Sequence, residues 1–220
     1  MEGFDWGFAL EILPLLLEAA RITVFATVIG FAVAVVLGLV LAILRMSRRW
    51  FISVPVGALI EFVRSTPLLI QIYFAFYVLP EFGIVLPAMV AGIAGLALHY
   101  SAYTAEVYRA GLQGIRRGQW EAAVALNLGP WTTYRDVVLP QAIPPVVPAL
   151  GNYLIAMFKD TPLLSAIAVV ELMQRAKIIG SDTFRYLEPI TLVGVFFLVM
   201  SLVSSALVRR VERRLALRKG

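Results

Sequence analysis

Three groups of polar side chains interrupt apolar segments and are the candidates for chemistry in this sequence. His99, Tyr103 and Glu106 follow at intervals of four and three residues, which places them on one face of a helix. An imidazole, a phenol and a carboxylate on one face can hold an ammonium or amidine group. Alternatively, His99 is an interior histidine with satisfied hydrogen bonds and Glu106 is an acid near the end of its segment.

A second group lies within residues 53–79. Arg64 and Gln71 are two helical turns apart, so a continuous helix would carry the guanidinium and the amide on one face. A charged side chain is costly in an apolar environment unless it faces protein or water. Glu61 is one turn before Arg64. This leaves two possibilities: an ion pair that fixes helix packing, or a place on a substrate pathway.

The third group is Lys159, Asp160, Thr161 and Pro162, which interrupts another apolar segment. A broken helix exposes backbone groups as well as side chains, and transport sites often use such breaks. Asp160 and Thr161 are therefore pathway candidates, with the carboxylate suited to a cationic amine. The alternative is a local ion pair between Lys159 and Asp160 at a membrane interface.

Composition identifies an integral membrane protein. The 220 residues are 60% hydrophobic, and the mean hydropathy is +0.86, whereas soluble domains are about half apolar. The absence of cysteine and the single histidine exclude disulfides, thiolate chemistry and Cys- or His-rich metal sites. The basic residues behind the net charge of +5 are clustered, so they do not indicate nucleic-acid binding. We expect one membrane domain over residues 1–220, with no catalytic residues and no metal.

The hydropathy pattern predicts an all-α fold with five transmembrane helices. A helix of about 20 apolar residues crosses the bilayer core, and the predicted spans are residues 22–44, 53–79, 88–108, 137–158 and 190–208. Residues 1–20 are expected to form an amphipathic lead-in at the membrane surface. Residues 163–170 are apolar but too short to cross, and are expected to be half embedded.

The distribution of basic residues predicts the orientation of these spans. Thirteen of the 19 lysines and arginines fall in the connection after the first span, the connection after the third, and the C-terminal tail. Cytoplasmic loops carry the excess of Lys and Arg. The N-terminus is therefore expected outside and the C-terminus in the cytoplasm. The basic tail is expected to be a membrane anchor, or alternatively a contact to a partner or to anionic lipid.

The cytoplasmic connection after the third span contains a short predicted helix, over about residues 117–128. Glu121, Ala122 and Ala123 favour helix, and their small side chains would let a partner approach closely. Asn127 and Gly129 are the residue types that most readily adopt a left-handed backbone, so the helix should end there. This predicts a docking helix that ends in a sharp turn.

The same stretch resembles the Glu-Ala-Ala motif of bacterial ABC importer permeases. Five residues match that pattern in register: Glu121, Ala122, Ala123, Leu139 and Pro140. Asn127 stands where the family has Gly, and Val137 where it has Ile. The resemblance implies the type I importer fold, a bacterial inner-membrane location, and an ATPase-coupling site formed by Glu121, Ala122, Ala123, Asn127 and Gly129.

Further runs resemble the polar amino acid branch of these permeases, the histidine, glutamine and arginine type. The run from Arg64 to Gln71 reads Arg-Ser-Thr-Pro-Leu-Leu-x-Gln, and a second run extends from Ala102 to Gly111. The Asp-Thr-Pro sequence at 160–162 is similar to permeases for ectoine and hydroxyectoine. The resemblance implies polar amino acids or such solutes as cargo, passing Arg64, Gln71, His99, Tyr103, Glu106, Asp160 and Thr161.

The resemblance also implies partners. These are a dimer of ABC ATPases, a second permease subunit, an extracytoplasmic solute-binding protein and membrane lipid. The sequence has no Gly-rich phosphate loop, so ATP and Mg²⁺ would be bound by the ATPase and no cofactor by this chain. An ATPase-independent transporter or channel is the alternative, and a membrane enzyme a weaker one.

Overall fold

The structure is a computed structural model that describes residues 3–216, and these residues form helices without any strand. The all-α class is confirmed. The helices are α1 (Trp6–Arg45), α2 (Trp50–Ser65), α3 (Leu68–Tyr73), α4 (Ala88–Gln113), α5 (Arg117–Ala125), α6 (Pro130–Thr132), α7 (Leu139–Asp160), α8 (Leu172–Thr183) and α9 (Leu187–Ala216). Four π or 3-10 segments join them: η1 (Phe74–Val78), η2 (Leu79–Phe82), η3 (Thr133–Val138) and η4 (Thr161–Ile167).

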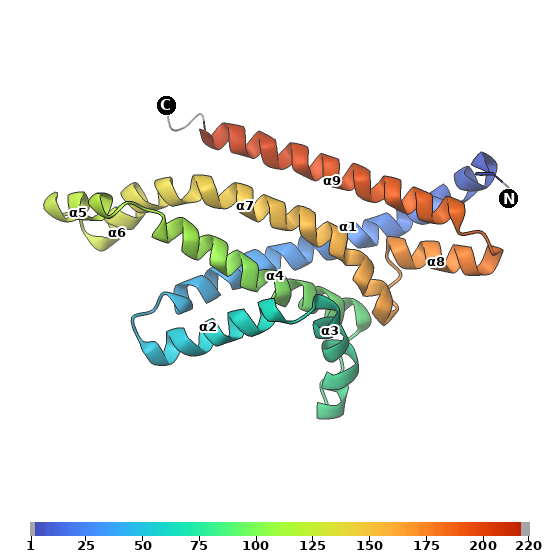
Figure 1. Cartoon of the computed structure of the whole chain (residues 1–220), viewed down its shortest axis with the longest axis horizontal. Coiled ribbons are helices and arrows are strands. Elements are labelled where there is room, and N and C mark those ends of the chain that lie inside the picture. The colour runs from blue at the N-terminus through green and yellow to red at the C-terminus, as the bar shows by residue number, and fades with distance from the viewer. Residues whose placement is uncertain (1–2, 217–220) are drawn as a thin grey trace.

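The long helices lie roughly along one common direction (Figure 1). α1 packs along α4, α4 contacts α7, and α7 packs along α9. The short helices α5 and α6 lie at one end of this bundle, and α8 lies at the opposite end with the N-terminus (Figure 1). The α3, η1 and η2 segment projects sideways from the bundle (Figure 1).

The contact between α1 and α4 is unusually close at Gly38. A Cβ atom at this position would lie 1.9 Å from Thr104 Oγ1 and 2.9 Å from the Ser101 carbonyl oxygen. The buried Thr104 hydroxyl donates a 2.9 Å hydrogen bond to the Ala34 carbonyl across the same interface. Small residues and interhelical hydrogen bonds are the usual means of joining helices in membranes.

The core and the surface of the bundle are both apolar. The central core joins α1, α4 and α7 through residues such as Ala34, Leu96 and Met157. On the outside, α1 and α9 leave large apolar side chains exposed, among them Val36 (65%) and Leu198 (58%). Soluble proteins rarely expose apolar surface so extensively, and lipid is its natural solvent.

Among residues 3–216, three helical segments are long and apolar enough to cross a membrane alone: Trp6–Arg45, Pro130–Ile167 and Leu187–Arg214. A fourth crossing results if α2 and the segment after it form one bent span. The expected spans 22–44, 88–108 and 190–208 fall within α1, α4 and α9. Residues 137–158 begin in η3 and continue in α7. α4 has 26 residues, about 39 Å of helix, but its second half is rich in polar side chains.

The lead-in expected over residues 1–20 is not a helix of its own in the described part. α1 continues without a break from Trp6 to Arg45. Its first turns are held by tertiary packing, because Ile12 and Leu16 are buried against α8 and α9. That packing partner is remote in the sequence, so the local pattern could not show it.

The expected span 53–79 is not one straight helix. α2 ends at Ser65, and the helical segment Leu68–Phe82 leaves it at an angle of 106°. Pro67 has no backbone N–H to donate and disfavours helical geometry in the residue before it, and Thr66 is accordingly extended (φ −107°, ψ 139°). The Thr66 hydroxyl donates to the Phe62 carbonyl at 3.0 Å, which closes the end of α2.

Candidate functional site

An aromatic cluster lies where α4 passes α7. The Tyr103 and Tyr153 ring centroids are 5.5 Å apart, and Tyr100 lies 6.3 Å from Tyr103 and 6.2 Å from Tyr153. Such spacing is typical of stabilising edge-on and tilted aromatic contacts. α4 supplies two of the rings because Tyr100 and Tyr103 are one helical turn apart.

A carboxylate closes one side of this cluster. The Tyr100 hydroxyl donates a 2.6 Å hydrogen bond to Asp160 Oδ2, at the residue where α7 passes into the 3-10 turn η4. Lys159 is exposed, and within residues 3–216 no ion pair joins it to Asp160. The alternative of a local Lys159–Asp160 pair is therefore not formed, and Asp160 is directed to the tyrosines.

A guanidinium contacts another ring of the cluster. Arg64 Cζ is 5.4 Å from the Tyr103 ring centroid, a cation–π distance. Arg64 Nη1 also approaches Glu61 Oε2 at 3.8 Å, but the Glu61 side chain is 72% exposed. An exposed pair of this length contributes little, so the contact to Tyr103 is the more specific of the two. The cluster thus has a cation at Tyr103 and an anion at Tyr100.

His99 and Glu106 separate although they share a helix face. The His99 ring is 5.2 Å from Tyr103 and 5.6 Å from Tyr100, so it belongs to the cluster. Its Nδ1 atom is buried and has no hydrogen-bond partner among the described residues. Glu106 instead forms a short, two-pronged ion pair with Arg109, at 2.5 Å for the closest atoms.

Two predicted pathway residues have structural roles. Gln71 does not share a face with Arg64, because the helix breaks between them. Its Nε2 donates to the Val63 carbonyl (2.8 Å) and to Thr66 Oγ1 (2.7 Å), so it fastens α3 to the end of α2. Thr161 is fully buried and donates to the Phe158 carbonyl at 2.6 Å. The sequence could not separate these polar residues from those that face the cluster.

Sequence reasoning missed Tyr100 and Tyr153. Tyr100 precedes Tyr103 by one turn, and Tyr153 precedes Asp160 by two turns, so helical spacing from the chosen residues would have found both. Within residues 3–216, no group of three or more His, Asp or Glu side chains is arranged to hold a metal ion.

The predicted docking helix is α5, which ends three residues earlier than expected. Asn127 adopts a left-handed backbone with φ 51°. Its N–H donates to the Val124 carbonyl (2.9 Å), and the Leu128 N–H donates to the Ala123 carbonyl (3.0 Å). This pair of bonds is the Schellman motif, which commonly uses Gly at the left-handed position and sometimes Asn. The predicted turn is confirmed at Asn127, whereas Gly129 has a φ of −64° and does not take part.

The predicted docking residues of α5 do not share one face. Glu121 and Ala122 are exposed, and Glu121 pairs with Arg117 at 2.9 Å. Ala123, by contrast, is only 2% exposed, because α5 packs on η3. Large apolar side chains point outward instead: Val124 is 78% exposed and Leu126 is 72% exposed. The surface that α5 offers to a partner is therefore larger and more apolar than the Glu-Ala-Ala motif suggested.

Side-chain contacts hold α5 to the bundle. The Trp120 and Tyr134 rings meet edge-on with centroids 5.5 Å apart. Gln141 Nε2, on α7, donates to Gln119 Oε1 at 3.1 Å and to the Val137 carbonyl at 2.7 Å. These contacts attach α5 to η3 and to the start of α7, the helix that carries Asp160 at its other end.

Comparison with known proteins identifies the family of the chain. Residues 34–217 match the family of binding-protein-dependent transport system inner membrane components. A probable amino-acid ABC transporter permease, y4tG of Sinorhizobium fredii, is 49% identical, with coverage of 96% of this chain and 94% of the relative. The glutamine transport system permease GlnP of Escherichia coli K12 is 36% identical, with coverage of 96% and 98%.

Solved structures show the same fold. A crystal structure of an amino acid ABC transporter with histidines superposes with a TM-score of 0.91 at 37% identity, covering 97% of this chain and 100% of that one. The inward-facing MetNI methionine ABC transporter gives a TM-score of 0.74 at 21% identity, covering 93% and 98%. The chain therefore has the type I ABC importer permease fold and belongs to the family of binding-protein-dependent transport system inner membrane components.

Proposed function

We propose that this permease carries a zwitterionic amino acid, or a compatible solute of similar charge, across the bacterial inner membrane. The observation that carries the proposal is the polar cluster, in which Arg64 and Asp160 flank a group of tyrosines. A guanidinium suits the carboxylate of an amino acid, and Asp160 suits its ammonium group. The names of the relatives, which include a glutamine permease and a transporter solved with histidines, agree with this cargo.

Transport would be driven by a pair of ATPases that grip α5 in a permease dimer, with a solute-binding protein at the opposite face. The support is the exposed apolar surface of α5 around Val124 and Leu126. The absence of a phosphate loop from the sequence agrees with a motor in another subunit. Family membership favours this mechanism over an ATPase-independent transporter.

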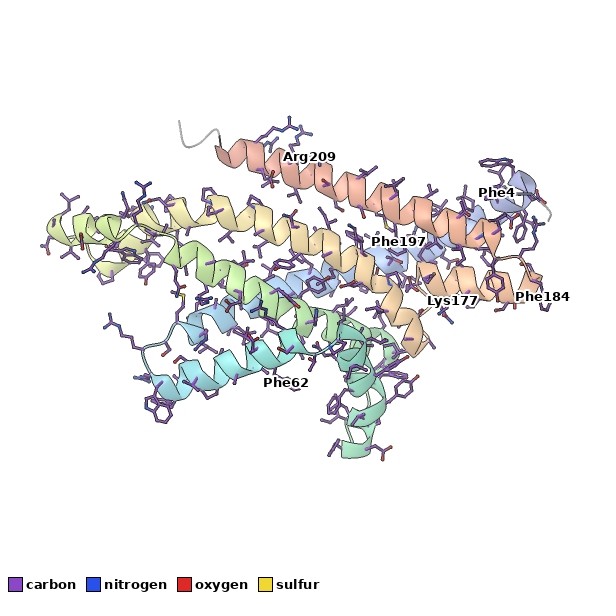
Figure 2. All side chains as sticks on the ribbon, in the orientation of Figure 1. Phe4, Phe62, Lys177, Phe184, Phe197 and Arg209 are labelled. Atoms are coloured by element: carbon purple, nitrogen blue, oxygen red, sulfur yellow. The ribbon has the colours of Figure 1, made fainter. Side chains whose placement is uncertain are left out.

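The α5 end of the bundle would face the cytoplasm, with the C-terminus inside and the N-terminus outside. The first connection, α5 and the C-terminal end of α9 all lie toward the same end of the bundle (Figure 1), and these are the segments richest in Lys and Arg. Arg209 lies toward this end of α9, whereas Phe4 and Phe184 lie at the other (Figure 2). Positive charge on one side is the usual mark of the cytoplasmic face.

Cargo assignment can be tested in the complete transporter, reconstituted in vesicles with its binding protein. Uptake of labelled glutamine, histidine and ectoine is compared for the native protein and for Asp160→Asn and Arg64→Gln. Each variant should lower uptake about tenfold or more, since it removes a charge-assisted contact. Lys159→Gln, an exposed neighbour, is the matched control. Native uptake by both Asp160→Asn and Arg64→Gln would refute the cargo site, and the preferred probe separates an amino acid from an ectoine-type solute.

A further inference from the structure

An open groove runs between α1 and α9, away from the polar cluster. Its volume is about 630 Å³. The walls are almost wholly apolar and include Leu17, Val24, Phe25, Val28, Phe196 and Met200. Phe25 is 54% exposed and Val28 50% exposed, so the groove opens on the outer surface of the bundle. A groove of this composition on a membrane protein suits a hydrocarbon chain.

Arg21 is the cationic side chain in the lining of this groove. It is exposed, and within residues 3–216 no ion pair or hydrogen bond joins its side chain to another residue. Arg21 is also the one basic residue of α1 before Arg45. A guanidinium matches the geometry of a phosphate group and binds it with two parallel hydrogen bonds.

The position of Arg21 along α1 corresponds to a headgroup. About 36 Å of helix separates Arg21 from Arg45, at the other end of α1. The hydrocarbon core of a bilayer is about 30 Å thick. When Arg45 lies at one interface, Arg21 therefore lies at the other, and the groove residues after it extend down into the hydrocarbon.

A carboxylate, that of Glu18, lies one helical turn before Arg21 in α1, on the N-terminal side. Glu18 is exposed and falls on the same helical stripe as Phe25 and Ile29, both of which line the groove. It forms no ion pair with Arg21, although the spacing would allow one, nor with any other described residue. Along α1 from the membrane interior outward, most of the apolar groove residues come first, then the cation Arg21 and the anion Glu18, with Leu17 beyond them.

A phospholipid with a phosphate and a primary ammonium group has the complementary order: acyl chain, phosphate, ammonium. We propose that the groove between α1 and α9 binds one such lipid, with its phosphate on Arg21, its ammonium on Glu18 and an acyl chain along Val24 and Val28. The site is separate from the transport pathway and does not depend on the cargo.

The test is lipid retention by the complete transporter, purified from a membrane of equal parts phosphatidylethanolamine and phosphatidylglycerol and measured by native mass spectrometry. Arg21→Gln should lower retention of both lipids about tenfold, since it removes the phosphate contact. Glu18→Gln should lower the ratio of phosphatidylethanolamine to phosphatidylglycerol by a similar factor and leave phosphatidylglycerol bound. Arg48→Gln and Glu81→Gln, exposed residues outside the groove, should change neither.

Three outcomes would overturn the proposal. They are equal retention in Arg21→Gln and the native protein, an unchanged lipid ratio in Glu18→Gln, or occupation of the groove by a second copy of the chain. Occupation by a second copy can be tested by disulfide crosslinking, because the native sequence has no cysteine that could react instead of an introduced one. Val28→Cys should give no disulfide between copies in oxidised membranes. Gel filtration and a thermal unfolding curve for each variant separate a lost lipid contact from a misfolded protein.

Discussion

α5 and α8 are both short helices outside the main bundle, but they relate to it in opposite ways. α8 buries Leu172, Ala176 and Ile179 against α1 and α9. α5 buries only Ala123 and exposes its larger apolar side chains. The 12 residues of α8 thus complete the fold, whereas the 9 residues of α5 present a surface. A helix with little packing of its own is stabilised by whatever binds it.

The N-terminal ends of α8 and α5 also differ in how firmly they are held. Glu171 is fully buried and its two carboxylate oxygens accept 2.8 Å hydrogen bonds from the Met173 and Gln174 N–H groups. The Leu172 N–H donates to Thr23 Oγ1 of α1 at 3.1 Å. α5 has no side-chain cap at its N-terminus. The start of α8 is therefore tied to the bundle, whereas α5 depends on its C-terminal turn.

The largest effect is expected at the cap of α8. Glu171→Ala leaves two buried N–H groups without an acceptor and should lower the free energy of unfolding by about 2 kcal/mol. Thermal unfolding of the detergent-solubilised protein measures the change. Glu171→Gln keeps an acceptor oxygen and should retain most of the stability. Equal losses in the two variants would show that the cap is not the source of the effect.

A pair of neighbouring alanines tests the packing of α5. Ala123→Asp places a carboxylate against η3 and should destabilise the protein by about 1–2 kcal/mol. Ala122→Asp, on the exposed side, should change stability by less than about 0.5 kcal/mol. Hydrogen exchange of the α5 amides reports both. If the α5 amides are equally protected from exchange in the two variants, α5 does not pack against η3 as described.

Docking is better tested at Val124 than at Ala123. Val124→Asp changes the exposed surface without disturbing the bundle, so the thermal unfolding midpoint should stay near that of the native protein. Association with the ATPase should fall about tenfold, because a charge replaces an apolar contact. Copurification of the ATPase measures it, with Gln113→Glu, an exposed residue of α4, as a control. Full association of the Val124 variant would exclude this face of α5.

The turn after α5 predicts a smaller effect. Asn127→Ala puts a residue with no left-handed preference at φ 51° and should cost about 1 kcal/mol. Asn127→Gly should be neutral or slightly stabilising, because glycine adopts this backbone freely. The helicity and hydrogen exchange of α5 distinguish the two. A loss of α5 protection in the glycine variant would contradict the Schellman geometry.

The two carboxylate caps should respond oppositely to pH. Burial raises the pKa of Glu171, so its contribution to stability is full below its unfolded pKa and is lost as pH rises through its folded value. The backbone N–H of Phe8, and then Arg185, lower the pKa of Asp5, so its contribution is present above its unfolded pKa and is lost as pH falls through its folded value. Unfolding curves between pH 3 and about 7 should lose the first trend in Glu171→Gln and the second in Asp5→Asn.

How far the sequence could predict this molecule follows from the range of each interaction. The helical class, α5 and the Asn127 turn depend on local residue preferences and were predicted. The break at Thr66 has a local cause in Pro67, but its angle depends on how Gln71 bonds back to the end of α2. The burial of Ala123 depends on η3, and that of Ile12 on α8 and α9, which are contacts between remote segments.

For the candidate site, too, only the features with a local cause could be predicted from the sequence. Helical spacing grouped His99 with Tyr103, and the break at residues 159–162 drew attention to Asp160. Spacing could not show that Tyr100 holds Asp160 across two helices, or that Glu106 turns to Arg109 instead. These choices depend on side-chain rotamers and on the crossing of α4 and α7.

The close contact at Gly38 restricts how this permease can move. A Cβ atom at position 38 would collide with Thr104, and the Thr104 hydroxyl donates a hydrogen bond to the Ala34 carbonyl across the interface. Sliding α1 along α4 would break this hydrogen bond and separate the closely fitted surfaces. We therefore expect α1 and α4 to move together when the permease changes shape. Movement of other segments is then easiest to accommodate where helices are already interrupted, at the extended residue Thr66 and at the change of helix type after Asp160.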